Sequence, residues 1–167
     1  MKNYQVSSVY IGGGTPSSID EQWIAALMEC VFDCFNVLPD AEISIECNPG
    51  TLSREKLLAY KDAGINRLSI GLQSANNDEL KRLGRIHTFE QFVTNYEVAR
   101  NVGFKNINVD LMYGLPEQSA SQYMATVNKI IRLHPDHISA YSLIVEKGTP
   151  FYEKYKFDMV RQEAGMR

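Results

Sequence analysis

Three consecutive glycines, Gly12, Gly13 and Gly14, stand between the apolar run VYI and a Thr-Pro pair. Glycine permits positive φ and lets a ligand approach main-chain N–H groups closely. The spacing matches neither G-x-G-x-x-G nor G-x-x-x-x-G-K-[ST], so it gives no specific support for a dinucleotide or P-loop site. A tight turn alone rarely needs three glycines. We therefore expect this segment to contact a ligand, with a plain turn as the alternative.

Hydrogen-bonding side chains stand near the ends of four later apolar runs: Glu46, Gln73, Asp110, and Tyr141 with Ser142. Any single one is readily explained as a polar group satisfied in a turn. The whole set is harder to explain in that way, because a buried carboxylate without a partner is strongly destabilising. We expect a shared polar mouth in which Glu46 and Asp110 meet a partner or a ligand.

Apolar runs rich in Val and Ile alternate along the chain with longer segments of helical periodicity. The predicted strands cover residues 6–11, 42–46, 67–72, 106–112 and 137–143, and the predicted helices cover 19–36, 53–63, 76–84, 88–102 and 119–132. Suitable helix N-caps are Ser18 or Asp20 and Ser53, and suitable helix ends are Gly64 and Gly103.

This alternation predicts an α/β fold with about five parallel strands and right-handed crossovers. A doubly wound open sheet and part of a TIM-like barrel both fit the order of elements. The polar strand ends favour the barrel, because such barrels build their active sites at the C-terminal ends of the strands.

Composition limits the classes of function. With 167 residues, 44% of them hydrophobic and 22% charged, residues 1–167 fit one domain. A net charge of -3 gives no sign of a nucleic-acid or anionic-membrane partner. No run is long and apolar enough to span a membrane, and the N-terminal residues carry no signal-peptide core. We therefore expect a cytoplasmic protein, and the odd number of cysteines fits a reducing compartment.

Six segments carry a more specific resemblance: YIGGGTPS, ECNPGT, GINRLSIGLQS, LGRIH, NVDLMYGLP and HISAYSLIVEKGTPF. In this order they resemble the radical S-adenosylmethionine (SAM) family that contains oxygen-independent coproporphyrinogen III oxidase (HemN) and the haem chaperone HemW. The resemblance runs from about Val9 to Tyr155, and the last two segments look more like HemW. It implies an incomplete (β/α)6 barrel, the radical SAM core.

The resemblance also assigns roles to residues. Matched to the family pattern, Gly13, Gly14 and Thr15 contact the methionine amino group of SAM, Glu46 and Gln73 bind its ribose, Arg85 pairs with its carboxylate, and Asp110 is a further pocket position. Weaker pocket positions are Asn48, Pro49, Gly50 and Tyr141. The residue types suit these roles, since carboxylate and amide oxygens accept from hydroxyl groups and a guanidinium pairs with a carboxylate. Without the resemblance, Arg85 would be an exposed helix-end charge and His87 an ordinary satisfied histidine.

The family pattern places a C-x-x-x-C-x-x-C loop for a [4Fe-4S] cluster before the glycine motif, but the eight residues before Val9 contain no cysteine. Cys30 and Cys34 have C-x-x-x-C spacing, yet the third position of the motif falls on Val37. We expect both thiols to be small buried groups of an amphipathic helix, and Cys47 alone cannot hold a cluster. No metal site is therefore predicted within this chain, and the cluster is expected only in a full-length parent.

Three hypotheses follow for function. The chain is part of a radical SAM enzyme that cleaves SAM and decarboxylates a tetrapyrrole, coproporphyrinogen III; or it is part of a carrier that binds haem and delivers it; or it is an inert fragment. The family's further barrel segment and C-terminal domain have no counterpart in the sequence. Exposed edge strands are then expected, and these favour self-association.

Overall fold

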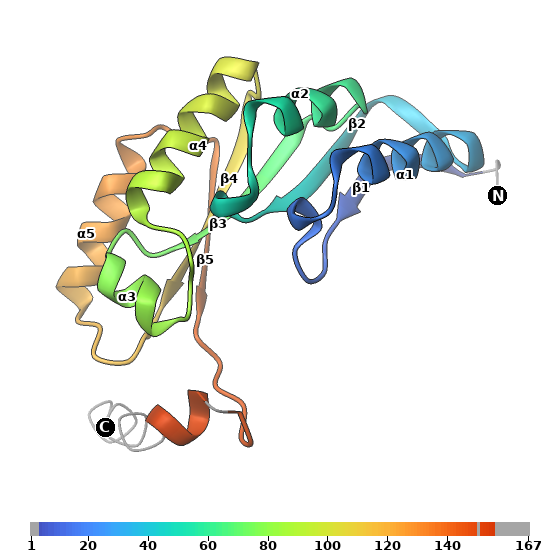
Figure 1. Cartoon of the computed structure of the whole chain (residues 1–167). Coiled ribbons are helices and arrows are strands. Elements are labelled where there is room, and N and C mark those ends of the chain that lie inside the picture. Colours follow the sequence, from blue (N-terminus) through green and yellow to red (C-terminus); the bar gives the residue numbers. More distant parts are fainter. Residues whose placement is uncertain (1–3, 150, 156–167) are drawn as a thin grey trace.

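The computed structural model describes residues 4–149 and 151–155. Its five strands form one parallel sheet in the order β1-β2-β3-β4-β5. They are β1 (Gln5–Ile11), β2 (Asn36–Cys47), β3 (Arg67–Gln73), β4 (Asn106–Tyr113) and β5 (His137–Ser142). The order follows the chain without reversal, as in a barrel, whereas a doubly wound sheet changes direction. The sheet curls into a half-barrel (Figure 1), which confirms the predicted fold class.

Helices connect the strands and cover the convex face of the sheet (Figure 1). They are α1 (Glu21–Cys34), α2 (Arg54–Asp62), α3 (Asn77–Arg82), α4 (Phe89–Val102) and α5 (Ala120–Ile131), with short 3-10 turns η1 (Pro16–Ser18) and η2 (Pro49–Thr51). Their bounds lie close to the predicted ones. The largest difference is in β2, which starts at Asn36 because Val37 pairs with Val6 across an irregularity in the register.

The helix ends form at the predicted residues. The Asp20 side chain accepts from the Gln22 amide over 3.1 Å, and the Ser53 side chain accepts from the Lys56 amide over 3.1 Å. Gly64 and Gly103 have φ of 89° and 98°, the left-handed conformation that ends α2 and α4.

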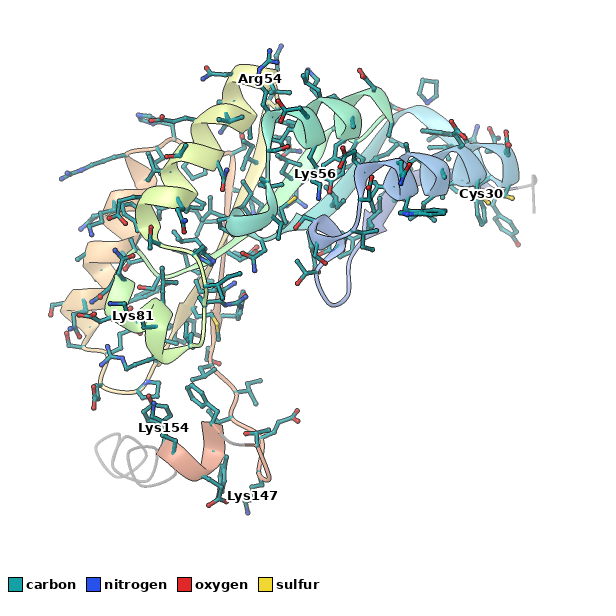
Figure 2. The ribbon with its side chains drawn as sticks, viewed as in Figure 1. Cys30, Arg54, Lys56, Lys81, Lys147 and Lys154 are labelled. Carbon is teal, nitrogen blue, oxygen red and sulfur yellow. The ribbon has the colours of Figure 1, made fainter. Side chains whose placement is uncertain are left out.

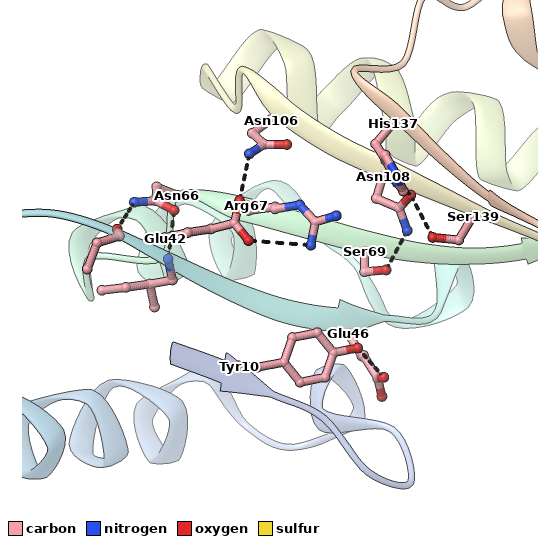
Figure 3. A network of polar contacts seen from close by, with 12 residues as sticks. Tyr10, Glu42, Glu46, Asn66, Arg67, Ser69, Asn106, Asn108, His137 and Ser139 are labelled. Carbon is pink, nitrogen blue, oxygen red and sulfur yellow. Dashed lines mark hydrogen bonds and ion pairs between the residues drawn. The ribbon is translucent and has the colours of Figure 1, made fainter. Parts of the chain in front are cut away.

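Alternation along the strands separates two faces of the sheet. The side chains packed against the helices are apolar and buried, among them Ile45, Leu68, Ile70, Ile107 and Val109. The opposite, concave face is polar from strand to strand (Figure 3): Arg67 pairs with Glu42 over 3.8 Å, and the Asn106 amide donates to Glu42 over 3.3 Å. A half-barrel therefore presents a polar interior.

Two strands lie at the edges of the sheet. In the described part of the chain β1 pairs with β2 alone, and β5 pairs with β4 alone. The aromatic side chains Tyr4 and Tyr10 are exposed beside the β1 edge. Among residues 4–149 and 151–155, no helix has the length and hydropathy needed to cross a membrane.

Candidate functional site

A cavity of about 180 Å³ opens where the strands end. It is lined by Gly14, Thr15, Glu46, Cys47, Asn48, Ser69, Gly71, Gln73, Arg85, Asp110 and Tyr141. Six of the seven residues chosen from the sequence are among them, and Gly13 is the exception. Of the weaker choices, Asn48 and Tyr141 line the cavity, whereas Pro49 and Gly50 do not. The structure thus brings the sequence-selected side chains into one place.

Each glycine of the loop meets a different constraint. A Cβ on Gly12 would lie 2.5 Å from a ring carbon of Tyr10 and 3.2 Å from Cδ of Glu46. Gly13 has a φ of 125°, which other residues rarely adopt. A Cβ on Gly14 would meet nothing within 4 Å, although Gly14 lines the cavity. The first two glycines are required by the fold, whereas the third leaves space open.

Glu46 connects the loop of residues 12–15, called the glycine loop below, to the sheet. Its Oε2 accepts from the Gly13 amide over 3.1 Å, and its Oε1 accepts from the Tyr10 hydroxyl (Figure 3). Partial burial and the Glu46 carboxylate raise the pKa of Tyr10 to about 12. Tyr10 therefore remains a hydrogen-bond donor at neutral pH. Nothing in the sequence singles out Tyr10 except its place near the end of an apolar run.

A second set of contacts supports the loop from behind. The buried Ser17 hydroxyl lies 2.6 Å from Oγ1 of Thr51 and accepts from the Asn48 amide over 2.9 Å. Lys56 of α2 donates to the carbonyls of Ser17 and Ile19, over 2.9 and 3.0 Å, and lies between α2 and the start of α1 (Figure 2). These contacts hold the glycine loop against the segment that follows β2.

Gln73 ends β3 in a strained conformation. Its φ is 74°, and the register with β4 shifts between Gly71 and Gln73. The side chain folds over Gly71, where a Cβ would lie 2.9 Å from Nε2 of Gln73. Its Oε1 accepts from the Tyr141 hydroxyl over 2.8 Å. Strain and bulges of this kind concentrate at functional sites.

Arg85 follows α3 through a left-handed glycine. Gly84 has a φ of 71°, and the Arg85 amide donates to the Leu80 carbonyl over 2.9 Å, which closes a Schellman motif. Within the described residues the guanidinium makes no hydrogen bond or ion pair, and the side chain is only half-buried. A cation without a partner therefore lines the same cavity as two carboxylates.

Asp110 is held by a polar network across the interior. Its Oδ2 accepts from Ser69 over 3.1 Å and its Oδ1 from the Asn108 amide over 2.7 Å. The Asn108 oxygen in turn accepts from Ser139 over 3.1 Å and contacts His137 (Figure 3). Burial raises the pKa of Asp110, and the Glu46 carboxylate adds to this, while hydrogen bonds from Asn108 and Ser69 oppose it.

His87 is buried beside this site but only half satisfied. Its Nε2 donates to the Leu72 carbonyl over 3.2 Å, whereas Nδ1 has no partner in the described part of the chain. Burial lowers the pKa of His87, and Arg85 lowers it further. The imidazole is therefore neutral at physiological pH.

The prediction that Cys30 and Cys34 are buried is wrong. Both thiols are exposed on α1, and Cys30 lies at the surface near the end of that helix (Figure 2). The buried side of α1 carries Ile24 and Met28 instead. Cys47 is buried, and burial raises the pKa of its thiol well above the usual range.

The described residues lack the ligand grouping that a metal site needs. Among residues 4–149 and 151–155, no three His, Cys, Asp or Glu side chains gather closely enough to hold a metal ion. An iron–sulfur cluster usually takes several thiolate ligands. The described residues therefore do not fit such a cluster.

Comparison with known proteins decides the family. The model of the Radical SAM superfamily matches residues 1–130. The chain belongs to the radical SAM superfamily. Within it, the chain is 42% identical to the haem chaperone HemW of Bacillus subtilis over 148 residues, which is 88% of this chain and 39% of the relative. HemW of Escherichia coli is 40% identical over 147 residues, again 88% of this chain and 39% of the relative.

A solved radical SAM structure shows the same architecture. Coproporphyrinogen III oxidase (HemN) from Escherichia coli, described as a radical SAM enzyme, superposes with a TM-score of 0.79 at 28% identity. The match covers 99% of this chain and 41% of that protein. The chain thus resembles both HemW and HemN, and it spans about two fifths of the length of these relatives.

Proposed function

We propose that the cavity at the strand ends binds SAM. The observation that carries this proposal is the gathering of Glu46, Asp110 and the unpaired Arg85 around one cavity. SAM carries a sulfonium, an ammonium and a carboxylate, so it is a net cation with one anionic group. Two carboxylates and one guanidinium complement that pattern of charge.

Arg85 pairs with the carboxylate of SAM. Its guanidinium offers a planar fork of N–H donors that matches a carboxylate in two parallel hydrogen bonds. No described carboxylate occupies it, so binding requires no existing ion pair to be broken. Gly84 sets the main-chain direction that brings Arg85 to the cavity.

Glu46 and Gln73 bind the ribose. Glu46 accepts one hydrogen bond at each oxygen, and a carboxylate oxygen can accept another from a ribose hydroxyl. Gln73 is oriented by the Tyr141 hydroxyl at Oε1, so its amide N–H groups remain as donors.

The glycine loop receives the ammonium group. An ammonium group only donates hydrogen bonds, so its partners in this loop are carbonyl oxygens. The Gly13 amide is itself a donor and is already bonded to Glu46. Thr15 donates to the Gly14 carbonyl over 2.7 Å and orients it. Asp110, whose oxygens already accept from Ser69 and Asn108, would contribute negative charge to the cavity that favours the cationic sulfonium. When bound, SAM supplies the carbon–sulfur bond that radical SAM chemistry breaks.

The longer protein to which these residues correspond acts on or carries a tetrapyrrole. The similarity to HemW at about two fifths identity supports haem as the cargo, and the superposition on HemN supports coproporphyrinogen III as the alternative. A haem titration compared with a decarboxylation assay separates them. Haem binding without decarboxylation supports the carrier, and decarboxylation supports the enzyme.

The SAM proposal is tested by titration calorimetry of the 167-residue chain with SAM. Arg85→Ala and Glu46→Gln are expected to weaken binding by roughly tenfold to a hundredfold, because a hydrogen bond to a charged group contributes about 1.5–3 kcal/mol. Arg132→Ala is the matched control, since Arg132 is an exposed arginine at the end of α5. Absence of saturable binding by the folded wild type, or equal affinity in all four proteins, would refute the proposal.

A further inference from the structure

Glu79 carries a fully buried carboxyl group outside the cavity. The residue is 0% exposed, and its Oε2 accepts from the Ser74 hydroxyl and from the Gln118 amide, the latter over 3.0 Å. Its Oε1 has no partner among the described residues. Burying a carboxyl group with one oxygen unpaired costs free energy, so this half-satisfied group calls for an explanation. Glu79 lies on α3, between the two segments that carry Gln73 and Arg85.

The first of these segments is tied to Glu79 at Ser74. The Ser74 hydroxyl, itself fully buried, donates to Glu79 and accepts from the Asn76 amide over 3.0 Å. The adjoining Ala75 amide donates to Thr126 of α5 over 3.3 Å. The residue immediately after Gln73 is therefore fixed to both α3 and α5.

A second contact fixes the residue immediately before Gln73. The Leu72 carbonyl accepts from Nε2 of His87 over 3.2 Å, and His87 is 3% exposed. A carbonyl only accepts, so Nε2 carries the proton in this contact. Gln73, with its left-handed φ of 74°, is thus held between two anchored neighbours.

The segment that carries Arg85 is held by the same two contacts, Ser74 with Glu79 and Leu72 with His87. Glu79 and His87 lie on either side of it in the chain, and the Schellman motif at Gly84 fixes the path between them. Two side-chain hydrogen bonds, Ser74 to Glu79 and His87 to Leu72, therefore join residues 72–74 to residues 79–87. We call these two joined segments the frame. These contacts hold the main chain at Gln73 and the main chain at Arg85 against the same two side chains.

We infer that Glu79 and His87 are positioning residues that set the spacing between Gln73 and Arg85, and that this spacing selects SAM over nucleosides without its aminoacyl chain. The inference rests on the proposed function, because it assigns Gln73 to the ribose and Arg85 to the carboxylate. A rigid frame favours a ligand that spans both groups, since small displacements of a positioning group weaken such binding strongly.

The test compares SAM with 5′-methylthioadenosine, which has the ribose but no carboxylate to meet Arg85. Glu79→Leu and Ser74→Ala are expected to weaken SAM binding by about tenfold and 5′-methylthioadenosine binding by less than about twofold. Glu79→Gln keeps an oxygen that accepts from Ser74 and Gln118, so it is expected to restore SAM affinity to within about threefold. Glu97→Leu, an exposed change on α4, is the matched control. Equal weakening of both ligands, or of neither, would overturn the inference.

Hydrogen exchange without ligand tests the frame separately from SAM binding. Ser74→Ala and His87→Phe are expected to speed amide exchange both at residues 72–76 and at residues 83–87, with α4 unchanged. Unchanged exchange in either segment would overturn the frame. If the wild type binds neither ligand, the proposed function fails, and the exchange result alone decides whether the frame exists.

Discussion

The Gly13 amide donates to Oε2 of Glu46 over 3.1 Å, which connects the loop after β1 to the end of β2. This contact depends on Gly13, whose φ is 125°, and on the absence of a side chain at Gly12, where Tyr10 and Glu46 approach. The triple glycine is therefore both a turn and part of the proposed SAM site. The three positions can be separated by mutation.

We expect Gly12→Ala to lower the stability of the fold and Gly14→Ala to weaken SAM binding. An added Cβ at Gly12 forces Tyr10 and Glu46 apart, which should lower the free energy of unfolding by about 1–3 kcal/mol. At Gly14 nothing opposes the methyl group, so the free energy of unfolding should change by less than about 0.5 kcal/mol while SAM binding weakens. Urea denaturation and SAM titration measure the two effects. A large loss of stability in Gly14→Ala with unchanged SAM affinity would contradict this account.

Tyr141→Phe tests the orientation of Gln73. The change removes the donor to Gln73 Oε1 but keeps the ring. The free energy of unfolding should fall by about 1 kcal/mol, and SAM should bind more weakly by about the same amount. Tyr4→Phe, at an exposed tyrosine, is the control. Identical SAM affinity in Tyr141→Phe and wild type would show that the Gln73 amide is not used.

The raised pKa of Asp110 predicts a pH dependence of SAM binding. The carboxylate takes up a proton at a higher pH than an aspartate of ordinary pKa does, so affinity for cationic SAM should fall as the pH is lowered through the pKa of Asp110. The stability of the chain without ligand has the opposite pH dependence. Because the pKa of Asp110 is raised by folding, the free energy of unfolding falls as the pH rises through that pKa.

Titrations across pH with wild type, Asp110→Asn and the exposed control Asp62→Asn measure this effect. Asp110→Asn should bind SAM more weakly at neutral pH and lose the acidic part of the pH dependence. A pH profile that stays the same in Asp110→Asn would show that another group titrates.

The edge strands predict self-association of the 167-residue chain. Sedimentation velocity should show an average mass that rises with concentration, because β1 and β5 each leave one side unpaired in the described residues. Ser7→Lys places a charge on β1 and should reduce association, whereas Asn128→Lys on α5 adds the same charge elsewhere. A wild type that stays monomeric at every concentration would rule out the edges as contacts.

Much of the fold and of the cavity lining was predictable because both depend on local patterns. Alternation of strands and helices, caps such as Ser53, and polar residues at strand ends are all visible in the chain. The grouping of Glu46, Gln73 and Asp110 around one cavity follows once the strands are parallel, whereas Arg85, which follows α3, was expected there from the family resemblance alone.

The missed features depend on packing between distant segments. Nothing local marks Glu79 as buried, because its partners Ser74 and Gln118 come from different loops. Cys30 was misplaced for a related reason: α1 has two apolar stripes, and only the one with Ile24 and Met28 faces the sheet, leaving Trp23 65% exposed. Periodicity shows which residues share a face, not which face is covered.

In the proposed site, Arg85 meets the carboxylate of a bound SAM molecule. The most direct measurement is the nuclear magnetic resonance signal of the Arg85 side-chain N–H in an isotope-labelled chain, assigned by its loss in Arg85→Lys. We predict that SAM shifts this signal saturably and that 5′-methylthioadenosine leaves it in place. A chain that binds SAM with no change at Arg85 would contradict the assignment of this site.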